Sequence, residues 1–158
     1  SLEGLFSLVA FGGVLFLIVI LAAVGFYGKA LYGTGKFGYY LLNTLVMLFV
    51  SLSVAYLAGL VASNKDALNG IVNVLSLGMC FLCGTFVPLD YISEEVKAVS
   101  QFFPVYWYET ANDLLGEFTV LTEQAEIQFF QAVGIQVAFG VALICVTLVI
   151  GKFRRVER

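Results

Sequence analysis

The stretch LFSLVAFGGVLFLIVILAAVGFY, residues 5–27, decides the fold class of this chain. It contains no charged side chain over its whole length. As an α-helix it would be about 34 Å long, which is enough to cross the hydrocarbon core of a bilayer. The apolar core of a signal peptide is much shorter. We therefore predict that residues 5–27 form a membrane-spanning helix.

Three further apolar runs lie along the chain, at residues 39–62, 67–87 and 129–150. A polar turn, SNKD at residues 63–66, separates the first two of these runs. Pro88 ends the run at residues 67–87, because proline cannot continue a helix and disfavours an α conformation in the residue before it. Together with residues 5–27, these runs predict four spanning helices.

The composition is that of a membrane protein. Hydrophobic residues make up 61% of the 158 residues, charged residues make up 12%, and the mean hydropathy is +0.98. A soluble domain has about 45–50% apolar and about 25% charged residues. The sequence therefore predicts an all-α polytopic membrane protein with about four transmembrane helices, in a single transmembrane domain over residues 1–158.

The chain contains no histidine and three cysteines. A Ser-His-Asp triad, an H-E-x-x-H zinc site and a histidine-ligated haem are therefore excluded. The cysteines lie in apolar runs, where we expect small buried hydrophobic residues and no metal site. The G-x-G-x-x-G match at residues 33–38 joins two predicted spans, whereas a dinucleotide site needs it between a strand and a helix. We expect a loop there and no nucleotide site in this chain.

Residues 88–128 differ from the predicted spans, since they carry eight acidic side chains and one basic side chain. Apolar residues recur at helical spacing after Ser93, the expected N-cap, and Pro104 should end that helix. A second short helix is predicted over residues 108–118. Because neither helix is long enough to cross a membrane, we predict an extracellular re-entrant helix pair.

Basic residues indicate the orientation of the chain. Four of the eight Lys and Arg residues lie in the tail KFRRVER, residues 152–158. Such residues accumulate on the cytoplasmic side of a membrane. We predict a cytoplasmic C-terminus and an outer segment at residues 88–128, although Lys29 and Lys36 between the first two spans count against this assignment.

Polar and small residues inside the spans form two patterns. Polar side chains on one face of the third run are costly against lipid and should meet protein or water. This face either packs against other helices or borders a substrate path; its members are Asn69, Asn73, Ser76 and Cys80. A ladder of small residues in the second run predicts close helix packing. The ladder consists of Ser51, Ala55, Gly59 and Ser63.

Acidic residues recur every four positions in the second short helix, at Glu109, Asp113 and Glu117. Like charges at this spacing weaken an isolated helix by about 0.2–0.5 kcal/mol per pair. A solvated outer face is the simpler interpretation, and contact with a cation or a cationic substrate is the alternative.

Several short motifs, in this order and spacing, resemble the C-terminal half of an ABC-2-type transporter permease. They are GLVAS at 59–63, GTFVPL at 84–89, IS at 92–93 and FPVYW at 103–107. Three positions depart from the family pattern. Cys83 stands in place of a serine, Ser93 in place of a proline found in many members, and Asn112 with Asp113 where many members have an arginine.

The resemblance implies the permease component of an ATP-binding cassette exporter in the plasma membrane. It implies six spans, of which the last four are present here, so the chain would be part of a longer permease. The expected partners are a cytoplasmic ATP-binding cassette ATPase, which would hold ATP and Mg, and a second permease subunit in a homo- or heterodimer within the lipid bilayer. No catalytic residue, metal or nucleic acid is expected.

The resemblance also suggests roles for individual residues. Lys65 and Asp66 are candidates for contact with the ATPase. The candidates for the extracellular gate lie in the re-entrant segment and are Pro88, Pro104, Tyr106, Trp107, Glu109 and Asp113.

Two alternatives belong to other functional classes. A non-transporting membrane scaffold or accessory subunit would use the polar face for helix packing alone. An intramembrane enzyme acting on lipid would use the row that begins at Glu109, but histidine, a Cys-His pair and a metal-ligand cluster are all missing from the sequence.

Overall fold

The computed structural model describes residues 2–33, 35–117 and 122–156, and these residues form helices and short connections without any strand. The all-α prediction is therefore confirmed. The α-helices are α1 (Leu2–Gly33), α2 (Phe37–Val61), α3 (Lys65–Leu82), α4 (Glu94–Ser100), α5 (Pro104–Glu117) and α6 (Glu123–Val156), and one 3-10 helix covers Leu89–Tyr91.

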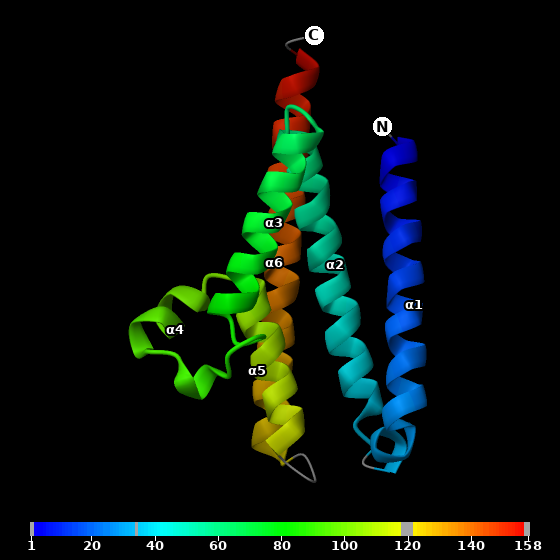
Figure 1. The fold of residues 1–158 in the computed structure, drawn as a ribbon, viewed down its shortest axis with the longest axis vertical. Helices are drawn as coiled ribbons and strands as arrows, with labels where there is room; N and C mark the ends of the chain where they lie inside the picture. Colours follow the sequence, from blue (N-terminus) through cyan, green and yellow to red (C-terminus); the bar gives the residue numbers. More distant parts are fainter. Residues whose placement is uncertain (1, 34, 118–121, 157–158) are drawn as a thin grey trace.

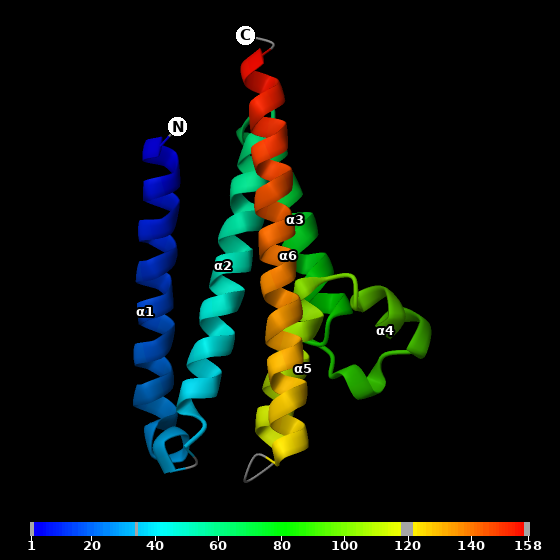
Figure 2. The ribbon, with the colours of Figure 1, turned by 180° about the vertical axis from the view of Figure 1, so that it is seen from behind.

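The long helices α1, α2 and α6 stand side by side along the length of the molecule (Figures 1 and 2). Both termini and the α2–α3 turn lie at one end, and the α1–α2 connection and the start of α6 lie at the other. Helix α3 stops part-way along α6, α5 lies beside the remaining part, and α4 projects to the side (Figure 1). This arrangement is that of an up-and-down bundle of long helices with the shorter helices α4 and α5 beside them.

Within the described residues, three helices, not four, are long and apolar enough to cross a membrane: Phe6–Phe26, Phe37–Val61 and Glu123–Phe153. The third predicted span, residues 67–87, was too long, because α3 has 18 residues and ends at Leu82. Gly84 follows with a φ of +98°, a conformation that favours glycine and turns the chain before Pro88 is reached. The two charged residues at the start of α3 also lower its apolarity.

Helices α2, α5 and α6 form the core. Buried side chains of α5 meet those of α6 in one cluster, and Tyr39 of α2 packs its ring edge-on against Phe129 with 5.3 Å between centroids. The fully or nearly fully buried members are Ala111, Leu115, Phe129, Ala132 and Val133. The short helix α5, predicted to be re-entrant, is thus an integral part of the buried cluster.

Helices α2 and α6 pack tightly at Gly140, where an added Cβ atom would lie 2.3 Å from Cε1 of Phe49. Helix α1 meets α2 at Gly12, whose Cβ position is 3.0 Å from Cδ2 of Leu52. Large apolar side chains on the rest of α1, such as Phe26, are exposed. That surface is suited to lipid or to another part of a larger assembly.

The re-entrant segment begins and turns where the sequence suggested, with one shift in position. Ser93 occupies the N-cap of α4, as predicted, although its side chain does not cap the helix. The backbone N–H of Glu95 and the Ser93 hydroxyl hold the pKa of the Glu95 carboxyl below its usual value. Helix α5 begins at Pro104 and not at residue 108, because proline fits the first turn of a helix.

Candidate functional site

The polar face of α3 is uncovered by the part of the chain that the structure describes. Asn69, Asn73 and Ser76 are exposed and Cys80 is half-buried. At 3.6 residues per turn these four positions lie within about 60° of arc, so they form one stripe. In a bilayer this stripe would have to face water or another protein chain.

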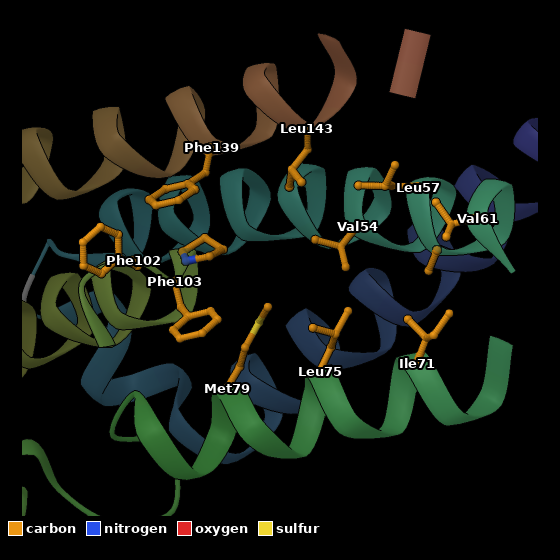
Figure 3. A pocket seen from close by; sticks show the side chains of 12 residues that line it. Val54, Leu57, Val61, Ile71, Leu75, Met79, Phe102, Phe103, Phe139 and Leu143 are labelled. Carbon is orange, nitrogen blue, oxygen red and sulfur yellow. The ribbon is translucent and has the colours of Figure 1, made fainter. Parts of the chain in front are cut away.

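The opposite face of α3 is apolar and borders a groove of about 370 Å³ between α3 and the α2–α6 pair. Ile71, Leu75 and Met79 point from α3 into the groove (Figure 3). The α4–α5 connection closes one end with Phe102 and Phe103. The remaining lining residues come from α2, α5 and α6 and are Val54, Leu57, Ala58, Val61, Pro104, Phe139 and Leu143.

None of the residues of α3 is buried, and the helix is tied to another helix at its C-terminal end, whereas its start carries a local cap. At its start, the Asn64 side chain accepts a hydrogen bond from the N–H of Ala67 at 2.8 Å. At its other end, the hydroxyl of the buried Ser100 donates to the Leu82 carbonyl at 2.5 Å. The groove leaves open space beside a helix that is tied to α4 at its C-terminal end, which is an arrangement that permits α3 to move.

The predicted gate residues lie on α5, except Pro88, which lies between α3 and the 3-10 helix. Pro88 is exposed, whereas Pro104 is buried at the start of α5. The rings of Tyr106 and Trp107 meet edge-to-face at 5.3 Å, and the indole N–H of Trp107 donates to the Gln101 carbonyl at 3.0 Å. These residues share one element, so they could move as a unit.

Glu109 links α5 to the end of α3, because its carboxylate accepts a hydrogen bond from Thr85 Oγ1 at 2.7 Å. Asp113 lies one turn further on and is exposed. Partial desolvation, followed by the nearby carboxylates of Glu117 and Asp90, raises the pKa of Asp113. The acidic row is therefore partly or fully exposed on the surface of the described structure, with Glu109 tied to the chain that follows α3.

A buried amide network joins α2, α5 and α6, and the sequence analysis did not identify it. Asn43 Nδ2 donates to the Tyr108 carbonyl at 3.1 Å and to Asn112 Oδ1 at 2.9 Å. Gln136 Nε2 donates to Asn43 Oδ1 at 2.9 Å. Both Asn43 and Gln136 are 0% exposed. Amides inside two apolar runs were the available signal, because such residues are rarely placed against lipid.

Lys36 was expected in a loop, but only 6% of it is exposed. Its Nζ donates to the Leu115 carbonyl at 2.7 Å, near the C-terminus of α5. Carbonyls in the last turn of a helix have no donor within the helix, so the Lys36 ammonium supplies one to Leu115. Its positive charge also interacts favourably with the negative end of the helix dipole. Beside it, the Tyr39 hydroxyl donates to Glu126 of α6 at 2.5 Å. This end of the bundle is therefore held together by polar contacts between helices.

A family model described as ABC-2 type transporter matches residues 3–111, which is more than half of the chain. The chain belongs to the ABC-2 type transporter family. No curated protein and no solved structure shows significant similarity to it. Membership identifies a multi-pass membrane protein that is a transport permease of the ABC type. The family model matches this ABC-2 permease from α1 through α4 and the first half of α5. Asn112 and Gln136 therefore lie beyond the matched residues.

The remaining predicted residues of this ABC-2 permease lie toward the end that carries both termini. Lys65 and Asp66 are exposed in the first turn of α3. In the small-residue ladder, Ser51, Gly59 and Ser63 are exposed and Ala55 is half-buried. Gly59 and Ala55 line a hollow of about 290 Å³ between α1 and α2, and nothing lies within 4 Å of a Cβ added at Gly59.

Proposed function

We propose that this ABC-2 permease is the membrane-spanning part of an exporter that moves its substrate across the plasma membrane by alternating access. A cytoplasmic ATP-binding cassette ATPase would bind ATP and Mg and drive the cycle. A second permease subunit would complete the path. The C-terminus would be cytoplasmic, as the basic residues of the tail favour.

The amphipathic surface of α3 carries this proposal. Its polar stripe around Asn73 is turned away from the rest of the chain, while its apolar face borders the groove. A helix that served only to fill the bundle would turn its polar side chains inward, because uncompensated polar groups facing lipid are costly. A water-filled path shared with a second subunit accounts for the observed orientation.

The attachments of α3 suggest how an ATPase could act on the outer segment. Lys65 and Asp66 lie at the end of the bundle that the basic tail assigns to the cytoplasm. The opposite end of α3 is tied to α4 through Ser100 and to α5 through Thr85. A tilt of α3 into the groove would therefore be transmitted to the gate residues, which is a rigid-body movement of a familiar kind.

The experiment uses the full-length permease purified together with its ATPase. We would compare ATP hydrolysis by the parent, by Asn73→Leu and by the control variant Val74→Leu, whose parent residue is 74% exposed on another face of α3. Asn73→Leu should change the hydrolysis rate several-fold, and Val74→Leu should not.

If the two variants hydrolyse ATP at the same rate, the polar stripe takes no part in coupling ATP hydrolysis to transport. If the permease does not associate with an ATPase, or has no effect on hydrolysis, the transport proposal is wrong. A scaffold that uses α3 for packing alone would then be the better account.

A further inference from the structure

Two side chains donate to α5, one from Lys36 at the N-cap of α2 and one from Asn43 within α2, and their spacing matches that of their acceptors. Lys36 reaches the Leu115 carbonyl at 2.7 Å, and Asn43 reaches the Tyr108 carbonyl at 3.1 Å. The donors are seven residues apart, and the acceptors are seven residues apart on α5. Because the two helices run in opposite directions, these contacts fix one face of α5 against α2 over two helical turns (Figure 1).

Backbone carbonyls repeat at every turn, so these two contacts alone do not define how far α5 is inserted. A slip of one turn, about 5.4 Å, would bring other carbonyls to the same donors. The hydrogen bond from Asn43 to the Asn112 side chain, at 2.9 Å, has no such repeat, because the neighbouring turns carry Tyr108 and Gly116. Asn112 therefore distinguishes the observed register from one that has slipped by four residues in either direction.

Gln136 holds Asn43 in the orientation that this register needs. Its Nε2 donates to Asn43 Oδ1 at 2.9 Å, which turns the Asn43 NH₂ group toward α5. The side-chain oxygen of Gln136, Oε1, is buried without a hydrogen-bond partner in the described structure. A buried unpartnered oxygen is destabilising, so stability alone does not explain a glutamine here. A single buried polar residue that sets helix register is a well-established use of such groups.

We propose that Asn43 is a positioning residue, which is held by Gln136 and sets the register of α5 through Asn112. The inference rests on the proposed function, because α5 acts as the outer gate only in a transporter. A slipped α5 would displace Tyr106 and Trp107 and would break the hydrogen bond between Glu109 and Thr85. By fixing the position of α5, the amide network would preserve the contact through which movement of α3 reaches the gate residues.

The test separates register from stability with a pair of variants. Asn43→Leu alone leaves the Gln136 amide buried and unpaired, and it should lower the thermal stability of the full permease with its ATPase. The double variant Asn43→Leu/Gln136→Leu removes the two fully buried amides and leaves only the half-buried Asn112 side chain without its Asn43 donor, so its stability should lie close to that of the parent. Thr147→Val is the matched control, since this buried hydroxyl on α6 bonds only the Leu143 carbonyl of its own helix.

The position of α5 would be read from a reporter cysteine at Ala111, which is 0% exposed. The native cysteines would be replaced by alanine, and a membrane-impermeant maleimide would be added from outside, with and without ATP and vanadate. Both variants that lack Asn43 should label about tenfold faster than the parent, the change that the free energy of about one buried hydrogen bond supports. Labelling in Thr147→Val should match the parent.

The double variant is decisive. Stability near that of the parent together with fast labelling supports a positioning role. Restored stability with labelling as slow as in the parent would overturn it and leave Asn43 a structural residue. If the Ala111→Cys protein does not assemble, Leu115→Cys is the second reporter, since Leu115 is 1% exposed. A parent whose labelling ignores ATP would contradict the transport proposal, while the comparison without nucleotide would still test the register.

Discussion

Two glycines on α6 should respond in opposite ways to the same substitution. A Cβ at Gly140 would lie 2.3 Å from Phe49 Cε1 and 2.7 Å from Cδ1, whereas nothing lies within 4 Å of a Cβ at Gly134. Gly134→Ala should stabilise α6 by about 0.5–1 kcal/mol, because alanine restricts the unfolded chain and favours the helix. Gly140→Ala gains the same helix preference but must displace the Phe49 ring.

Overpacking of this kind costs about 1–3 kcal/mol, so Gly140→Ala should be less stable than Gly134→Ala by roughly that amount. Phe49 is 37% exposed, so its ring can move toward lipid, which places the expected difference toward the lower end of that range. The assay is thermal unfolding of the purified permease in lipid nanodiscs. For a protein of this size, about 1–3 kcal/mol corresponds to a difference in Tm of several degrees.

Removal of the Phe49 ring provides the control. In a Phe49→Ala background, Gly140→Ala should become as favourable as Gly134→Ala, since the obstructing atoms are gone. Equal Tm shifts for the two glycine variants in the parent background would refute the packing of α2 on α6 described above. If Gly140→Ala still lowers the Tm relative to Gly134→Ala in the Phe49→Ala background, atoms other than the Phe49 ring cause the clash.

Three further predictions concern the polar contacts. Lys36→Met should destabilise the fold by about 1.5–3 kcal/mol, because the Leu115 carbonyl loses a charged donor, and Lys36→Arg should recover part of this in the same unfolding assay. Ser100→Ala should free the end of α3 at Leu82, which faster hydrogen exchange of the residues that follow would reveal. Asp113→Asn should raise the stability of the folded protein at neutral pH. Because the pKa of Asp113 is raised in the folded state, the parent loses folding stability as the pH rises through that pKa. The difference in stability between the variant and the parent should therefore disappear in acid.

The apolar runs were sufficient to predict the helices and their order, because each run must be buried in lipid or protein. They were not sufficient to place the end of α3. Nothing in hydropathy distinguishes the chain before Gly84 from the chain after it, and the turn depends on a backbone conformation with a φ of +98°. The run up to Pro88 was therefore counted as a span although the helix ends at Leu82.

Helical spacing identified Asn69, Asn73, Ser76 and Cys80 as one face, and the structure leaves that face uncovered. Spacing could not identify the network of Asn43 and Gln136, since each is a single polar residue in an apolar run. Their partners come from residues 65 to 93 positions away in the chain. Such contacts depend on how α5 folds back between α2 and α6, and a periodic pattern on one helix contains no information about its neighbours.

The central claim is that the polar stripe of α3 borders the transport path. The most direct test places single cysteines at Asn73 and at Val74 in the full-length permease with its ATPase, after the native cysteines have been replaced. A cysteine at residue 73 should react with a membrane-impermeant maleimide at a rate that changes between the nucleotide-free state and the state trapped with ATP and vanadate. A cysteine at residue 74, on the other face, should react slowly in both. Slow labelling at residue 73 in both states would contradict the account.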